Sequence, residues 1–414
     1  MAAPSLEGVS ARRGALQLLD AVLRRGQTLE AAAQKVAAAD RPLALAIAGE
    51  TLRHLPDLDA AIDSATRQRL PDDAKARMVL RQALAQKVAL NVPDHALVAT
   101  ALPLVDGGPR RLVHGVLGTL LRRGLPAQEE ARLPAEVEAR WTEQWGADAV
   151  AAARRAIVKR PPLDLSFAAS EEATEFAAEQ GGEQLAPSHV RLHGGRSVAE
   201  LPGFSEGGWW VQDLAASLPA RLLPRAARQV LDLCAAPGGK TMQLAASGHR
   251  VTALDRSESR LRRLAENLAR TGLSANTVVA GALDWSGGPY DAVLLDAPCS
   301  ATGTFRRHPE VLYRARPPII AESAALQRRL LAHAASLLRP GGTLVYAVCS
   351  LERDEGEAVI AAQHGLTLQP IGSSELPAGI VPAPQGWVRV LPNMLEEAGG
   401  LDGFFIARLV RPPA

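Results

Sequence analysis

Apolar residues recur at spacings of three and four along the first 125 residues. The pattern is clearest in five stretches: 15–23, 43–52, 76–90, 95–105 and 111–122. Such spacing predicts amphipathic helices. Glycine, proline and aspartate interrupt it at 25–26, 55–56, 71–72, 91–93 and 107–109, where helices commonly end. We therefore predict an all-α bundle over residues 1–127.

From residue 228 onward, short apolar runs alternate with helical patterns. The predicted strands are 230–234, 251–254, 277–279, 292–295 and 343–348, and the predicted helices are 241–246, 257–271 and 321–338. This alternation is typical of a parallel sheet with crossover helices. The final run, 404–409, is expected to pair as an edge strand. The pattern predicts an α/β, Rossmann-like domain over residues 226–414.

The region between these two parts has a mixed pattern. A polar linker is predicted at 128–134, followed by a small α+β module at 135–225 with one or two helices in 141–158 and strands at 163–167 and 189–192. Trp209 and Trp210 precede an amphipathic helix that Asp213 could cap. Adjacent tryptophans suit base stacking, but core packing is the favoured interpretation.

Length and composition bound the class of protein. A chain of 414 residues has room for two or three domains. Its three cysteines cannot form a closed set of disulfides, and its beginning lacks the apolar core of a signal peptide. No apolar run approaches the roughly 20 residues of a membrane span. We expect a cytoplasmic protein that crosses no membrane, and the net charge of +2 does not decide its partner.

A glycine turn follows the first strand of the α/β part. Its ending, Gly239-Lys240-Thr241, is reminiscent of a phosphate loop, but that motif needs glycine where Cys234 stands, so nucleotide triphosphate hydrolysis is excluded. Asp255 ends the second strand, where an acid can accept hydrogen bonds from ribose, and Asp284 follows the third, where it could meet an adenine amino group. Each acid could instead be a helix cap. The predicted cofactor-binding residues are Cys234, Ala235, Ala236, Pro237, Gly238, Gly239, Lys240, Asp255, Asp284 and Asp296, and the predicted ligand contains adenosine.

All three cysteines lie at strand ends. Cys234 follows the first strand, Cys299 follows the strand that ends near Asp296, and Cys349 follows the strand at 343–348. Open α/β sheets bind ligands along the edge formed by their carboxyl strand ends, so this grouping predicts an active site. The alternative is that each cysteine is a small buried apolar residue. No metal site is predicted.

These motifs resemble the NOL/NOP/Sun family of S-adenosylmethionine-dependent RNA cytosine-5 methyltransferases. The resemblance rests on DLCAAPGGKT, LDAPCSATGTFRRHPE, LVYAVCS and DGFF. It implies S-adenosylmethionine as the cofactor, Cys349 as the nucleophile, Cys299 as an aid to product release and Asp296 as a hydrogen-bond partner of the base. DNA cytosine-5 methyltransferases are the nearest competitors, but they carry Pro-Cys-Gln where this chain has Pro-Cys-Ser. The basic residues 306–308 could contact RNA phosphates or be solvated surface.

The helical part resembles NusB-like domains, through residues 12–23, the stretch GETLRHLPDLDAAID, residues 92–95 and residues 111–113. That resemblance implies an RNA-binding module, although the last helix lacks the usual asparagine and arginine. The two resemblances together imply 16S ribosomal RNA as the substrate, and we expect a monomeric enzyme. Another RNA, such as tRNA, and a non-catalytic RNA-binding scaffold remain as alternatives.

Overall fold

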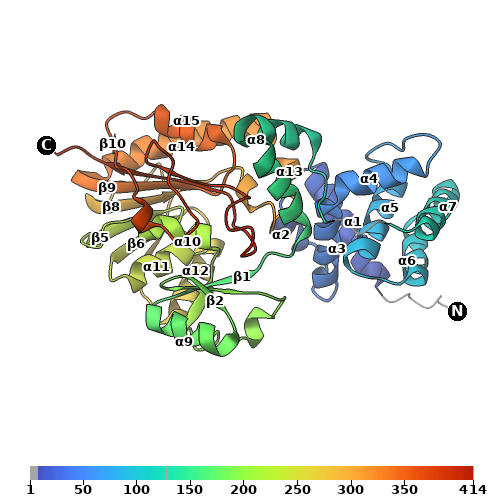
Figure 1. Ribbon diagram of the computed structural model, residues 1–414, viewed down its shortest axis with the longest axis horizontal. Helices are drawn as coiled ribbons and strands as arrows, with labels where there is room; N and C mark the ends of the chain where they lie inside the picture. Colours follow the sequence, from blue (N-terminus) through green and yellow to red (C-terminus); the bar gives the residue numbers. More distant parts are fainter. Residues whose placement is uncertain (1–7, 126–128, 414) are drawn as a thin grey trace. The chain divides into compact units, whose positions relative to one another are not determined.

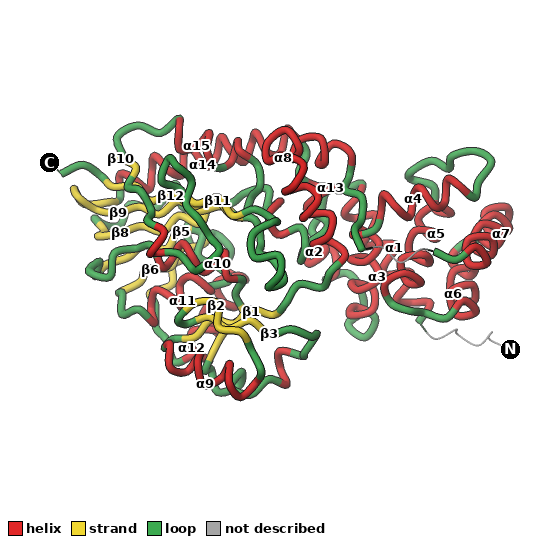
Figure 2. Tube along the Cα trace, in the orientation of Figure 1, coloured by secondary structure: helices red, strands yellow, loops and turns green. Residues whose placement is uncertain are grey.

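A computed structural model describes residues 8–125 and 129–413 (Figures 1 and 2). The chain forms two compact units. The first holds the described residues up to 143 together with 150–159 and 305–315, and the second holds 144–149, 160–304 and the remainder from 316. The predicted order of a helical part followed by an α/β part is confirmed. The hydrophobic pattern did not predict that residues 305–315 belong to the first unit.

The first unit is the predicted helical bundle. Its helices are α1 (Val9–Leu23), α2 (Leu29–Ala33), α3 (Arg41–Arg53), α4 (Leu55–Ser64), α5 (Lys75–Ala89), α6 (Asp94–Ala101), α7 (Gly107–Arg123) and α13 (Val311–Arg314); α8 (Ala135–Val158) is kinked at Gly146 and contributes to both units. Helix α5 packs against α1, α3, α4, α6 and α7. Even its Arg77 and Arg81 are buried, because Asp59 and Asp63 on α4 pair with their charges.

Residues 305–315 fold as part of this helical unit. Phe305 packs edge-on against Trp141 with ring centroids 5.4 Å apart. The Tyr313 hydroxyl donates a hydrogen bond to the carbonyl of Leu52 at 2.8 Å. Arg306 is buried, with 2% of its surface exposed, so the expectation that it is a solvated or phosphate-contacting surface residue is wrong.

The predicted linker, 128–134, begins at a residue outside the described ones, and its described part is packed. Ala131 is fully buried, and its amide donates to the carbonyl of Arg154 at 3.0 Å. The amide of Arg132 donates to the Asp57 carboxylate at 2.9 Å. Residues 129–134 are therefore fixed within the first unit.

The second unit begins with a small antiparallel sheet in the order β2-β3-β1-β4. Its elements are β1 (Leu163–Phe167), α9 (Ser170–Gln180), β2 (Glu183–Ala186), β3 (His189–Leu192) and β4 (Trp209–Val211). Trp209 and Trp210 are 1% and 2% exposed, which confirms core packing. Asp213 caps the following helix, α10 (Leu214–Arg221), by accepting from the amide of Ala215 at 2.9 Å, as predicted.

The large sheet has the order β10-β12-β9-β8-β5-β6-β7, with β11 paired to β12. Its strands are β5 (Gln229–Leu233), β6 (Arg250–Asp255), β7 (Asn276–Val279), β8 (Tyr290–Asp296), β9 (Leu338–Val348), β10 (Thr367–Leu368), β11 (Val388–Val390) and β12 (Phe404–Val410), and its helices are α11 (Gly239–Ala246), α12 (Glu258–Thr271), α14 (Pro317–Ser336) and α15 (Glu357–Ala361). Strands β5 to β9 are parallel. The predicted Rossmann-like sheet is confirmed.

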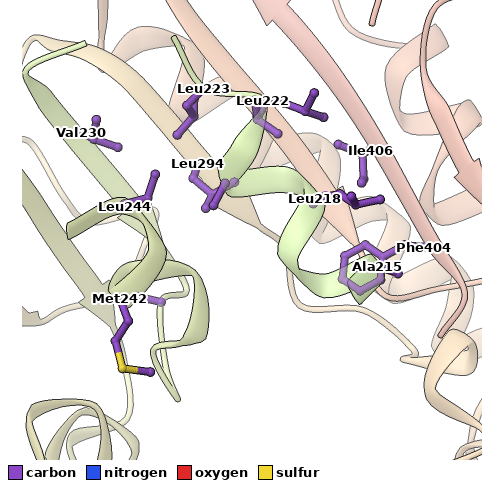
Figure 3. Close-up of a cluster of buried hydrophobic side chains, with 14 of the residues drawn as sticks. Ala215, Leu218, Leu222, Leu223, Val230, Met242, Leu244, Leu294, Phe404 and Ile406 are labelled. Atoms are coloured by element: carbon purple, nitrogen blue, oxygen red, sulfur yellow. The ribbon is translucent and has the colours of Figure 1, made fainter. Parts of the chain in front are cut away.

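Helices cover both faces of this sheet (Figure 1). Alternate strand residues point to opposite faces, so Leu294 packs with α10, α11 and α12 while its neighbours Val293 and Leu295 pack with α14 and α15. Figure 3 shows Leu244 of α11 near Leu294 of β8, and Leu218 of α10 near Ile406 of β12, within one buried cluster. Burial on both faces explains why the parallel strands are near-continuous apolar runs in the sequence.

One strand prediction is wrong. The run at 404–409 forms β12, but it is internal, because β9 lies on one side of it and β10 and β11 lie on the other. These two covering strands have only two and three residues. Strands so short carry too little alternation to be recognised in the sequence.

A buried ion pair holds the small sheet together. Asp164 of β1 faces Arg191 of β3, and both nitrogen–oxygen distances are 2.7 Å. Burial favours the neutral form of Asp164, but the hydrogen bonds from Arg191 and His189 outweigh it and hold the pKa of Asp164 well below its usual range. The resulting stabilisation is present above the unfolded-state pKa of about 4 and is lost as the pH falls through the lower folded-state pKa.

Replacing one partner should leave a buried, uncompensated charge. We predict that Arg191→Met lowers the free energy of opening of β1 and β3 by about 3–5 kcal/mol, measured by hydrogen exchange of their amides. The control is Arg262→Met, which removes an exposed pair with Glu258 and should change it by less than about 1 kcal/mol. Equal effects of the two substitutions would contradict the role of the buried pair.

Candidate active site

The carboxyl ends of β5, β6 and β8 surround a cavity of about 490 Å³ in the second unit. The chain passes from β5 to β6 and β7 on one side and then returns to β8 on the other, which is the switch point where open α/β sheets bind ligands. The lining residues are Cys234, Leu254, Asp255, Arg256, Arg260, Gly281, Ala282, Leu283, Asp284, Pro298, Leu326 and Leu330. A larger cavity, of about 690 Å³, lies in the helical unit and contains none of the predicted site residues.

The glycine turn lies against this cavity. Gly238 has φ +109°, and an added Cβ would lie 2.8 Å from Cγ of Leu264, so only glycine fits there. Helix α11 begins at the next residue, and its N-terminus carries positive potential. Of the predicted turn residues, Cys234 lines the cavity, and burial raises the pKa of its thiol to about 12. Cys234 is therefore a neutral lining residue.

Two predicted acids lie at the cavity wall. Asp255 is buried and accepts from the amides of Ser257 at 2.9 Å and Ala236 at 3.3 Å. The cap of α12 is Ser257, which accepts from the amide of Arg260, so Asp255 joins the glycine turn to the start of that helix. Asp284 is exposed and also lines the cavity. A cavity of this volume, with acceptors on its wall and apolar side chains across it, fits an adenosine-containing ligand.

Cys299 and Cys349 converge, although 50 residues separate them in the chain. Their strands β8 and β9 are parallel neighbours, with Asp296 opposite Ala347, and the two sulfur atoms are 3.5 Å apart. All three cysteines are free and partly exposed. The hydrogen bond to Cys349 and burial raise the pKa of Cys299 well above its usual value. Cys299 is therefore held as a neutral thiol beside Cys349.

Asp296 and Lys240 form the charged pair of the site. The Lys240 ammonium lies 2.8 Å from a carboxylate oxygen of Asp296 and 5.2 Å from the ring centroid of Phe404. Burial disfavours the charge on Lys240, but the attraction of Asp296 outweighs it, so the pKa of Lys240 is raised. The sequence placed Lys240 with the cofactor, whereas the structure shows that its ammonium contacts Asp296 directly.

A further acid, Glu355, lies at the site and was not among the predicted site residues. This residue is fully buried and accepts hydrogen bonds from Ser300 and Ser350, the residues that follow the two cysteines. The repeated Cys-Ser pair at two strand ends was the available signal. Within residues 8–125 and 129–413, no three His, Cys, Asp or Glu side chains are grouped to hold a metal, and no helix is long and apolar enough to cross a membrane.

A strand-end cavity in a Rossmann-like sheet, with two thiols 3.5 Å apart at neighbouring strand ends, is compatible with a methyltransferase that has an accessory helical domain. Comparisons with known proteins agree with this class. The model of the NusB family matches residues 9–122, and the model described as 16S rRNA methyltransferase RsmB/F matches residues 219–410. The chain belongs to the RsmB/F family, and both resemblances seen in the sequence are confirmed.

Curated relatives match over nearly the full chain. The ribosomal RNA small subunit methyltransferase B of Xylella fastidiosa (strain Temecula1) is 36% identical, over 98% of this chain and 99% of its own length. The protein of the same name from Klebsiella pneumoniae subsp. pneumoniae is 34% identical, with the same two coverages. The whole architecture, and not one domain alone, is therefore shared with these relatives.

Solved structures agree with the fold. The protein PH0851 has a TM-score of 0.72 and 25% identity and covers 99% of both chains. A methyltransferase homolog protein from Pyrococcus horikoshii has a TM-score of 0.56 and 27% identity, over 71% of this chain and 98% of that chain.

The cavity assignment predicts a loss of cofactor affinity. Asp255→Asn exchanges a charged acceptor for a neutral amide, and a hydrogen bond to a charged group contributes about 1.5–3 kcal/mol. The Kd for S-adenosylmethionine, measured by calorimetry, should rise about 10- to 100-fold. The control Glu258→Gln lies three residues away and is exposed, and its Kd should stay within about twofold of the wild type. An unchanged Kd for Asp255→Asn would place the cofactor elsewhere.

Proposed function

We propose that this chain methylates carbon 5 of a cytosine in 16S ribosomal RNA, with S-adenosylmethionine as the methyl donor. The observation that carries the proposal is the pair of free thiols 3.5 Å apart, at the ends of neighbouring strands. A single thiol beside a cofactor cavity would fit many enzymes. Two converging thiols fit a reaction in which a bond to sulfur is made and later broken.

The chemistry explains the need for a nucleophile. Carbon 5 of cytosine is a weak nucleophile, and addition of a thiolate to carbon 6 moves electron density onto carbon 5. S-adenosylmethionine supplies, when bound, an electrophilic methyl group. Cys349 is the proposed nucleophile, in agreement with the family resemblance. Its sulfur forms a bond to carbon 6. After methyl transfer a water molecule takes the carbon-5 proton, the electrons of that C–H bond re-form the 5,6 double bond, and the carbon–sulfur bond breaks with its electron pair returning to Cys349.

Cys299 is proposed to assist the second half of this sequence. The elevated pKa of Cys299 keeps its thiol protonated, so it can donate a hydrogen bond to the thiolate of Cys349 as the carbon–sulfur bond breaks. This stabilises the leaving group without a second covalent bond. The assignment gives the two cysteines different roles because only Cys349 attacks the base.

Asp296 is proposed to hydrogen-bond the polar edge of the cytosine near N3 and N4. The Asp296 side chain is 30% exposed, and one of its carboxylate oxygens contacts the Lys240 ammonium. The contact with Lys240 fixes the direction of the Asp296 side chain, so its carboxylate can accept from the base and offset charge as it develops.

The helical unit is proposed to bind RNA. Support comes from the NusB family match and from the names of the full-length relatives, which act on the small subunit ribosomal RNA. We expect a monomer that works in the cytoplasm. A tRNA substrate and a non-catalytic RNA scaffold are the remaining alternatives, and the assay below separates them.

The cysteine roles predict two different defects. Cys349→Ala should abolish transfer of a tritiated methyl group to 16S RNA, because no bond to carbon 6 can form, while its Kd for S-adenosylmethionine stays near that of the wild type. Cys299→Ala should accumulate a covalent protein–RNA adduct, visible as a slow band on a denaturing gel. Adduct formation by Cys349→Ala would reverse the two assignments.

The same assay tests the substrate. Wild-type protein should label 16S RNA, and bisulfite sequencing of the product should locate the methyl group at a cytosine. Preferential labelling of tRNA would favour the alternative substrate. Tight RNA binding without labelling of any RNA would favour the scaffold.

A further inference from the structure

A buried carboxylate links the two cysteine loops. Glu355 lies in the short 3₁₀ turn Arg353–Glu355 after β9 and is 0% exposed. One carboxylate oxygen accepts from the amide of Ser300 at 2.8 Å and from the side-chain amide of Gln327 at 3.2 Å. The other accepts from the hydroxyl of Ser350 at 2.5 Å and from the hydroxyl of Ser300. Four donors from three different segments therefore meet on one side chain.

These four donors match the acceptor capacity of a carboxylate. An ionised carboxylate only accepts hydrogen bonds and has about four lone-pair sites, so four donors fill it. Burial raises the pKa of Glu355, while the donated hydrogen bonds oppose that shift. No lysine or arginine of the described residues forms an ion pair with Glu355. The hydrogen bonds reduce the cost of burying this carboxyl group.

The serines connect this acid to the thiols. Ser300 follows Cys299 and Ser350 follows Cys349. Each cysteine is therefore the immediate chain neighbour of a serine that donates a hydrogen bond to Glu355. Further bonds join the same two loops: the amide of Gly303 donates to the carbonyl of Cys349 at 3.1 Å, and the amide of Leu351 donates to the hydroxyl of Thr302 at 2.9 Å. The loops thus form one hydrogen-bonded body with Glu355 at its centre.

We propose that Glu355 is a positioning residue for methyl transfer, because its carboxylate holds Ser300 and Ser350 together and thereby fixes the separation of the Cys299 and Cys349 thiols. The inference rests on the cysteine roles proposed above. It assigns Glu355 no contact with RNA or cofactor. Its effect is on geometry, and a shift of about 1 Å at a reacting group can cost about 100-fold in rate.

The substitution Glu355→Gln tests this role with little change of shape. An amide has one acceptor oxygen and one donor nitrogen, so it cannot accept from all four donors. We expect the NH₂ of the introduced amide to point toward the two serine hydroxyls, because these hydroxyls can rotate to accept a hydrogen bond. The link between Ser300 and Ser350 is then weakened while the backbone amide of Ser300 keeps its acceptor.

A matched control lies in the same turn. Asp354 is the preceding residue and is exposed, so Asp354→Asn makes the same change of charge one residue away. Glu355→Gln should lower the single-turnover rate with 16S RNA about 10- to 100-fold, with the Kd for S-adenosylmethionine and the KM for RNA within twofold of the wild type. Asp354→Asn should keep the wild-type rate.

A purely structural role would lower the melting temperature without a specific kinetic signature. Our expectation is specific: Glu355→Gln should accumulate the covalent adduct even though Cys299 is intact, because the misplaced thiol releases the product slowly. If Glu355→Gln does not fold, Ser350→Ala removes one of the same hydrogen bonds and should show a smaller rate loss of the same kind.

The outcomes separate this inference from the proposed function. A wild-type rate in folded Glu355→Gln or Ser350→Ala, alongside an adduct in Cys299→Ala, would overturn the positioning role and leave the cysteine roles intact. Absence of an adduct in Cys299→Ala itself would instead contradict the proposed mechanism.

Discussion

The parallel pairing of β8 with β9 is the constraint on which the site depends. Strand β9 returns beside β8 after the long helix α14, and residues 294–296 face 345–347 in the ladder. Both strands end at the same edge, so the residues that follow them must meet there. A slip of one residue in this register would turn alternate side chains to the opposite face. Apolar burial on both faces of the sheet therefore also sets the position of the sulfur atoms.

Polar contacts hold the side chains and loops that follow the paired strands. The Lys240–Asp296 pair fixes a charge at the end of β8, and Glu355 joins the loops beyond β8 and β9. Glu355 is held by donors in surroundings with little water, where hydrogen bonds are electrostatically strong. Lys240 orients the Asp296 carboxylate, and Glu355 holds the serines beside the two cysteines, so these side chains are in position before RNA binds.

Much of this arrangement follows from local sequence. The apolar run of β8, the acid after it and the cysteines after two strands all predict an active edge, because strand burial and strand ends leave local patterns. Asp213 is recognisable as a cap because it directly precedes an amphipathic helix. In contrast, the internal position of β12 depends on strands of two and three residues. The Glu355 cluster depends on residues 300, 327, 350 and 355 meeting in space, and the return of 305–315 to the helical unit depends on packing by Phe305 and Tyr313. The Glu355 cluster leaves only the serine after each cysteine as a local trace, and the other two features have no local signature.

The central claim is that Cys299 and Cys349 are adjacent in the folded protein, whereas Cys234 lines the cavity at the strand ends. Oxidation of the native wild-type protein by diamide, followed by alkylation, digestion and mass spectrometry, tests it directly. The account predicts a disulfide between the peptides that contain Cys299 and Cys349, and an alkylated Cys234. Alkylation of Cys299 and Cys349 as separate free thiols, or a disulfide that includes Cys234, would contradict it.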